Sequence, residues 1–129
     1  MDPVTVVPLI GAVVKAGLAI TEFTNSCIDA KNDLAAVQKE LDDLQRVLKL
    51  LQAEIADRNI PDSLKGGIRS TTSNMSGVVG QIKQLLESNS GKIGAVKWTM
   101  SGKTQAAALR SQLAAYRDSL SLTLEMMSL

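Results

Sequence analysis

A long apolar segment near the N-terminus is the sequence feature that most constrains the fold. Residues 4–20, VTVVPLIGAVVKAGLAI, carry only Thr5 and Lys15 as polar side chains. A helix that is apolar on every side must be surrounded by other helices or enter a membrane. The segment is short for a transmembrane helix and is interrupted by Pro8 and Lys15. We therefore expect the central helix of a bundle, with membrane insertion as the alternative.

The first helix is expected to start near Thr5, because threonine caps helix N-termini and Pro8 is tolerated only in a first turn. It continues past Phe23 and is rich in glycine and alanine. Such small side chains allow close approach of neighbouring backbones, in membrane helix contacts and in soluble packing alike. Soluble packing is the favoured interpretation.

A second helix is predicted after Asn32, with an apolar side chain at steps of three and four over about seven turns. This apolar stripe comprises Leu34, Val37, Leu41, Leu44, Leu48, Leu51 and Ile55. The other face is charged, and Asp42–Arg46 and Glu54–Arg58 are spaced as i,i+4 ion pairs. Each buried Leu or Ile contributes about 1.5–3 kcal/mol, far more than a surface pair, so the stripe should hold this helix.

The segment Asn59-Ile60-Pro61-Asp62 predicts a helix end followed by a new helix start. The third helix should run from Asp62 to Ser88. It contains four glycines, each of which costs about 1 kcal/mol of helix propensity relative to alanine; they are Gly66, Gly67, Gly77 and Gly80. We therefore expect its first half to be irregular or mobile.

The segment after Asn89-Ser90-Gly91 is predicted to hold a single helical turn or a loop at residues 93–100. Trp98 lies there between Lys97 and Lys103, an arrangement found at membrane interfaces. Packing of the indole on the end of the bundle is the favoured alternative. Residues in this region form a candidate interface: Lys92, Lys97, Trp98 and Lys103.

A last helix should begin at Ser101 as its cap. Its buried stripe is predicted to comprise Ala106, Leu109, Leu113, Tyr116, Leu120, Leu124 and Met127. The fold class is therefore all-α: one domain, residues 1–129, built as a bundle of four main helices and a short connecting helix. Its core is expected to include Leu41, Leu44, Leu48, Leu51, Leu113, Tyr116 and Leu120. The helical pattern reaches Leu129, so we expect the domain to be part of a longer protein.

The charge balance argues against an obligatory polyanionic partner, because 14 basic and 13 acidic residues give a formal net charge of +1. Bases nevertheless exceed acids in the second half, and none of the residues between Glu87 and Asp118 is acidic. A solvated surface that complements acidic residues of the second helix is favoured there over a site for anionic lipid, with nucleic acid the weakest alternative.

Catalytic chemistry is not indicated. The chain has no histidine, and its one cysteine, Cys27, lies in an apolar stretch typical of a buried thiol. No phosphate-binding loop, nucleophile elbow or metal-spaced cluster occurs. We expect a protein that is not an enzyme and needs no cofactor. Asp2 and Pro3 precede the apolar run where a signal peptide would carry bases, so a reducing, cytoplasmic location is expected.

Three parts of the chain resemble the helical N-terminal domain of many fungal proteins, Nod-like receptors among them. They are the opening MDPVTVVPLIGAVVKAGLAITEF, the segment DAKNDLAAVQKELDDLQRVLKLL, and KIGAVKWTMSGKTQAAALRSQLAAYRDSLSLTLEMM near the end. The most distinctive features are the Met-Asp-Pro opening and Lys97-Trp98 followed by a patterned helix with Leu113, Tyr116, Leu120 and Leu122.

This resemblance implies a bundle related to HeLo and HeLo-like domains, which are clustered by a sensor or NTPase domain, move to the plasma membrane and cause cell death. The effector helix would be Val4–Phe23, with these residues in the active role: Ile10, Gly11, Val14, Lys15, Gly17, Leu18 and Phe23. The expected partners are further copies of the chain and anionic lipids, and nucleic acid is not expected. The alternative function is a non-lytic homotypic interaction domain, in which the bundle stays closed.

Overall fold

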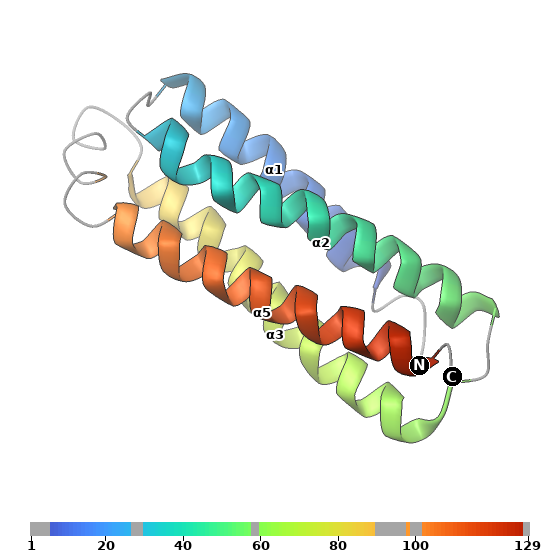
Figure 1. Ribbon diagram of the computed structural model, residues 1–129. Helices are drawn as coiled ribbons and strands as arrows, with labels where there is room; N and C mark the ends of the chain where they lie inside the picture. The colour runs from blue at the N-terminus through green and yellow to red at the C-terminus, as the bar shows by residue number, and fades with distance from the viewer. Residues whose placement is uncertain (1–5, 27–29, 58–59, 90–97, 99–101, 128–129) are drawn as a thin grey trace.

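The computed structural model describes residues 6–26, 30–57, 60–89, 98 and 102–127, and within these residues the chain is helical with no strand. Four long helices form one elongated bundle (Figure 1). They are α1 (Val7–Ser26), α2 (Lys31–Asp57), α3 (Asp62–Ser88) and α5 (Lys103–Met127). The predicted all-α bundle of four main helices is confirmed.

The helices form a ring in which sequence neighbours are not always packing neighbours. Both α2 and α3 pack mainly against α1 and α5. Consequently α2 and α3, although joined by a short connection, lie diagonally across the bundle. Figure 1 shows that α1 begins and α5 ends at the same end of the bundle.

The stripe of α2 was predicted correctly at every position. Leu34, Val37, Leu41, Leu44, Leu48, Leu51 and Ile55 are all buried. On α5, Ala106, Leu109, Leu113, Leu120 and Met127 are buried. Tyr116 and Leu124 are partly buried and pack against the core. The predicted core residues therefore meet in one cluster.

The expectation of an irregular first half of α3 was wrong. The helix is continuous from Asp62, and its first turn is closed by N–H groups of Leu64 and Lys65 that donate to the Pro61 carbonyl. Gly66 and Gly67 are exposed, so they weaken the helix without disturbing its packing. Burial of one apolar face outweighs that cost; the buried residues are Ile68, Thr72, Met75, Val78, Val79, Ile82, Leu85 and Leu86.

At its C-terminus α3 ends at Ser88, as predicted, and the side-chain amide of the following Asn89 donates to the Leu85 carbonyl at 2.7 Å. The predicted caps Thr5 and Ser101, and most of the predicted turn at residues 93–100, lie outside the described residues.

The predicted central position of the N-terminal helix was wrong. Although α1 is apolar nearly all round, it occupies one corner of the ring and packs on α2 and α3. One face is buried, while Leu18 is 63% exposed and Val7 is 48% exposed. Four helices of similar length bury one face each, so none of them is enclosed by the others.

Candidate functional site

The exposed face of α1 is the candidate functional site. Its buried face consists of Leu9, Val13, Ala16, Ile20 and Phe23. On the solvent side, Val7, Gly11, Val14 and Leu18 follow at steps of four, three and four, and all four are exposed. This spacing places them on one side of the helix. We call these four residues the α1 strip. Exposed apolar residues gathered on one face and bordered by polar ones are typical of interaction surfaces.

The border on the α2 side is polar. A shallow hollow of about 200 Å³ separates α1 from α2, and Gln38, Asp42 and Gln45 of α2 line it together with Val14 and Leu18. Gly17 faces the same seam, since a Cβ atom added there would lie 3.4 Å from Gln38 Nε2. The α1 strip is therefore an apolar ridge beside amide and carboxylate side chains.

The predicted effector residues do not all lie on this surface. Gly11, Val14, Lys15 and Leu18 are exposed, and Gly17 is half-buried. Ile10 is partly buried and packs against the core. Phe23 is buried, so in the closed bundle it cannot contact a partner or a membrane.

By length and composition α1 is also suited to a membrane. The span Val7–Asn25 is long and apolar enough to cross a bilayer, and only 28% of it is buried within the bundle. Its charged residues are Lys15 and Glu22. Each helix of this bundle buries one face, so the property that sets α1 apart is that much of its exposed face is apolar as well.

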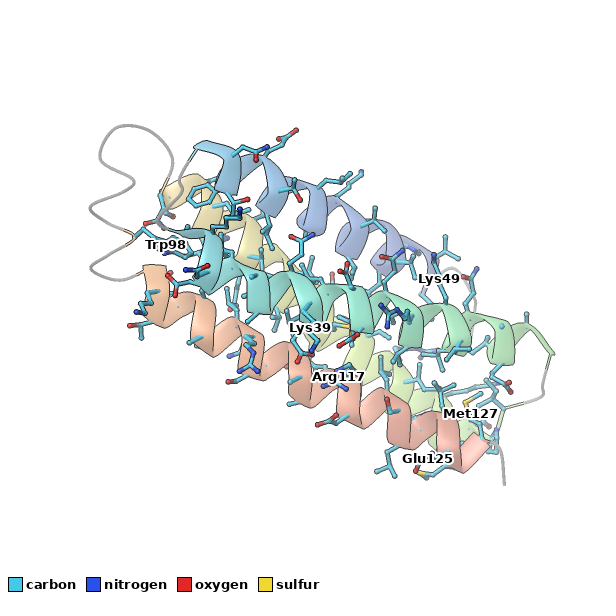
Figure 2. The ribbon with its side chains drawn as sticks, turned by 45° about the horizontal axis from the view of Figure 1, so that its top comes forward. Lys39, Lys49, Trp98, Arg117, Glu125 and Met127 are labelled. Atoms are coloured by element: carbon cyan, nitrogen blue, oxygen red, sulfur yellow. The ribbon has the colours of Figure 1, made fainter. Side chains whose placement is uncertain are left out.

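Trp98 packs at the end of the bundle where α1 ends (Figure 2). The indole is 1% exposed, and its Nε1–H donates to Asp33 Oδ2 of α2 at 2.9 Å. Its ring centroid lies 5.7 Å from that of Phe23, with an interplanar angle of 48°. A tilted aromatic pair of this kind adds to the energy of apolar burial.

This placement corrects the candidate interface. Because Trp98 is buried, it packs on the end of the bundle, as the favoured interpretation held, and offers no surface to a membrane or partner. Lys103 is exposed at the start of α5. Lys92 and Lys97 lie outside the described residues.

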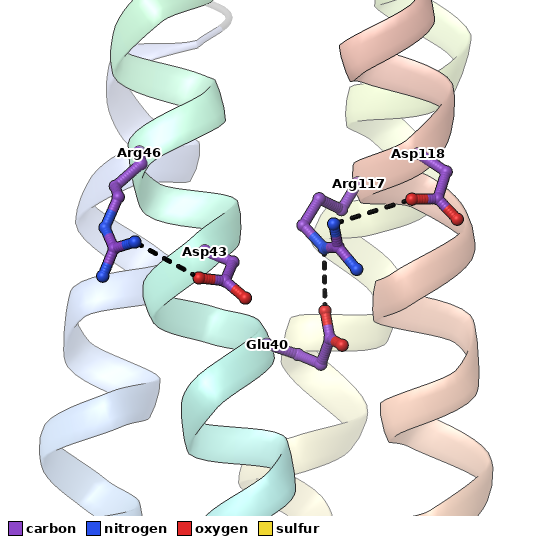
Figure 3. A network of polar contacts seen from close by, with 5 residues as sticks. All are labelled: Glu40, Asp43, Arg46, Arg117 and Asp118. Carbon is purple, nitrogen blue, oxygen red and sulfur yellow. Dashed lines mark hydrogen bonds and ion pairs between the residues drawn. The ribbon is translucent and has the colours of Figure 1, made fainter.

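An ion pair joins α5 to α2, as expected for basic residues of the second half that complement acidic residues of the second helix, but the sequence reasoning did not identify the two partners. Arg117 Nε of α5 donates to Glu40 Oε2 of α2 at 2.9 Å, and Glu40 is 9% exposed (Figure 3). The hydrogen bond from Arg117 to Glu40 raises the pKa of the guanidinium above its usual value, so Arg117 stays charged. Within α2, Arg46 pairs with Asp43 at 3.4 Å, not with Asp42 as predicted.

A signal for this pair was present in the sequence. Glu40 lies three residues after Val37 and four before Leu44, and Arg117 lies four after Leu113 and three before Leu120. Each charged residue therefore occupies a position at which the three-and-four spacing of the predicted stripe would place an apolar residue. Opposite charges at the edges of two stripes indicate that the two helices pack side by side.

The part of the chain that the structure describes contains no candidate metal site. Among the described residues no group of three or more carboxylate or thiol side chains is arranged to hold a metal ion. No family model, no curated protein and no solved structure matches the chain.

Proposed function

We propose that this chain is an N-terminal effector and signalling domain that acts by self-association and by membrane targeting through α1. The observation that carries the proposal is the apolar α1 strip on the exposed face of a helix that is long and apolar enough to span a bilayer. The resemblance of the opening and final segments to fungal Nod-like receptor domains supports a cytoplasmic domain that triggers cell death at the plasma membrane.

Release of α1 is the costly step of this mechanism. Leu9, Val13, Ile20 and Phe23 are buried between α1 and the rest of the bundle. At about 1.5–3 kcal/mol for each side chain, their exposure to water would cost about 6–12 kcal/mol. Lipid hydrocarbon buries the same side chains again and also buries the α1 strip. Insertion can therefore offset the cost of leaving the bundle, whereas release into water cannot.

Clustering supplies the second part of the mechanism. Lys15 stands near the middle of the span Val7–Asn25, where a charged side chain costs about 2.5–3.5 kcal/mol in a bilayer. Several copies of α1 side by side can turn their lysines toward a common water-filled lumen and avoid this cost. Self-association and insertion therefore favour each other.

The test is dye release from vesicles that contain anionic phospholipid. Leu18→Glu is the informative variant, because Leu18 is 63% exposed and the substitution leaves the closed bundle intact. Leu50→Glu on α2 is the matched control, since Leu50 is 60% exposed. We expect the unmodified chain and Leu50→Glu to release dye and Leu18→Glu to release little. Equal release by both variants would contradict the proposal.

Point variants are preferable to removal of residues 1–23, which would also remove the buried stripe of α1. Gly17→Glu is a less specific test than Leu18→Glu, because a side chain at position 17 would also contact Gln38 of α2. A folded variant that loses only dye release separates the membrane step from folding.

The alternative function is a closed interaction module. The α1 strip follows the three-and-four spacing of a coiled-coil seam, which favours contact with the same strip of a second copy. This alternative predicts concentration-dependent association without lipid that is lost in Leu18→Glu, together with no dye release by the unmodified chain.

A further inference from the structure

A second hollow lies on the other side of α1, between α1 and α3, with a volume of about 470 Å³. This size is within the range of small-ligand sites. Small side chains create it: α1 contributes Ala12, Ala16 and Ala19, and α3 contributes Gly80. Val79 and Leu86 of α3 add apolar surface. We call this hollow the α1–α3 groove.

Two cations border the mainly apolar groove. Lys15 of α1 and Lys83 of α3 line it, and no carboxylate does. Both lysines are exposed, and neither forms an ion pair with another described residue. The nearest acidic residues along the two helices, Glu22 and Glu87, do not line the groove.

The positive charge continues toward the start of α1. An adjoining hollow of about 350 Å³ is lined by Arg69, Thr72, Ser73 and Ser76 of α3 and by Pro8 and Leu9 of α1. Ser76 lines both hollows. The whole seam between α1 and α3 therefore combines an apolar floor with three cations and several hydroxyl groups, the chemistry expected around an anionic amphiphile.

We propose that the α1–α3 groove binds a free fatty acid, with its acyl chain on the alanine floor and its carboxylate between Lys15 and Lys83. The floor of the groove is formed by three alanines of α1 and by Gly80 of α3, whose short side chains leave a narrow apolar channel. A channel of this kind suits a single hydrocarbon chain. The two lysines select a carboxylate over a neutral or cationic head.

Such a ligand contacts α1 and α3 together, so it binds only while α1 remains in the bundle. By mass action it stabilises the closed bundle. The binding site itself does not depend on the proposed membrane function; a role in holding α1 closed does rest on it. The two are separable, because Leu18 does not line the groove.

The experiment is a titration of the whole chain with dodecanoate below its micelle concentration, followed by calorimetry and by the thermal unfolding midpoint. Gly80→Leu places a side chain in the groove, and nothing lies within 4 Å of the Cβ atom that it adds. Gly77→Leu is the matched control: Gly77 is equally open but does not line the groove. Both changes replace a helical glycine by a better helix former, so both variants should fold.

We expect saturable binding of one dodecanoate and a raised unfolding midpoint for the unmodified chain and for Gly77→Leu, and loss of both in Gly80→Leu. Lys15→Gln and Lys83→Gln should each weaken binding by about fivefold, as for a partly exposed ion pair. Equal binding by Gly80→Leu and Gly77→Leu, equal binding of dodecyltrimethylammonium, or non-saturable binding with a lowered midpoint would overturn the proposal.

Discussion

The indole Nε1–H of Trp98 donates to Asp33 Oδ2 at 2.9 Å and joins residues 65 positions apart in the chain. A hydrogen bond to a charged group contributes about 1.5–3 kcal/mol. Trp98→Phe keeps an aromatic ring beside Phe23 but removes this donor. We expect it to lower the free energy of unfolding by about that amount, measured by urea denaturation with circular dichroism.

The control is a double-mutant cycle with Asp33→Ala. If the hydrogen bond accounts for the loss, the double variant should be scarcely less stable than Trp98→Phe alone. Strictly additive losses would show that the two side chains stabilise the bundle independently.

The packing between Trp98 and the start of α5 gives a second prediction. A Cβ atom added to Gly102 would lie 2.5 Å from Cε3 of Trp98, closer than any normal contact. Gly102→Ala must therefore displace the indole, and we expect a loss of about 1–3 kcal/mol in unfolding free energy. Because Trp98 is the only tryptophan, its emission should also shift to longer wavelength.

Gly67→Ala provides the contrast, since nothing lies within 4 Å of a Cβ atom added at this position, in the second turn of α3. It should stabilise the protein by about 0.5–1 kcal/mol with unchanged emission. A destabilised Gly67→Ala or a fully stable Gly102→Ala would contradict this assignment of the two glycines.

Periodicity predicted the helices well because a stripe such as that of α2 depends on spacing alone. Periodicity could not predict the buried face of a helix in which apolar residues occupy nearly every position. Nearly every position of α1 is apolar, so the sequence could not indicate which face is buried, and only packing separates Leu9, which is 4% exposed, from Leu18, which is 63% exposed. In α3, local glycine propensity was given more weight than the burial of a whole face.

The long-range side-chain contacts were harder to predict for a different reason. Spacing assigns a residue to a face but does not identify its partner. The Glu40–Arg117 pair spans 77 positions and the Trp98–Asp33 pair spans 65. Both depend on which helices are neighbours in the ring, and the diagonal placement of α2 and α3 is not encoded in the spacing of either helix.

The pair of Glu40 and Arg117 gives a third prediction. Arg117→Leu leaves the carboxylate of Glu40 nearly buried without its partner. We expect a loss of about 1–3 kcal/mol in unfolding free energy. Glu40→Leu combined with Arg117→Leu should recover most of it, since apolar side chains can replace such a pair. A double variant as unstable as Arg117→Leu would show that shape, not charge, is the requirement.

The same pair has a defined pH dependence. Its hydrogen bond raises the pKa of Arg117 in the folded state, so the stabilisation from this arginine is present below the unfolded-state pKa and is lost only as the pH rises through the folded-state pKa. Unfolding free energy measured from neutral to mildly alkaline pH should therefore differ between the unmodified chain and Arg117→Leu by a constant amount.

The core of α2 gives a fourth prediction. Leu44 is 0% exposed, so Leu44→Asp buries a carboxylate with no partner. We expect a cost of about 5 kcal/mol or more, comparable with the whole stability of a small domain, and a largely unfolded chain. Leu50→Asp on the same helix should remain folded because Leu50 is 60% exposed. A helical, monomeric Leu44→Asp variant would refute the role assigned to the stripe.

Lys15 allows the clustering step of the proposed mechanism to be tested apart from membrane binding. In the closed bundle Lys15 is exposed, so Lys15→Leu should leave the fold unchanged. Without the charge near the middle of α1, the chain should bind vesicles more tightly, by up to the cost of about 2.5–3.5 kcal/mol for a buried lysine. If the lysines line a shared lumen, dye release per bound chain should nevertheless fall, because the lumen loses its polar lining.

Vesicle sedimentation and dye release, with Lys49→Leu on α2 as the control, measure the two effects separately. Release that rises in proportion to binding would mean that α1 disrupts the bilayer as single helices, without a lumen.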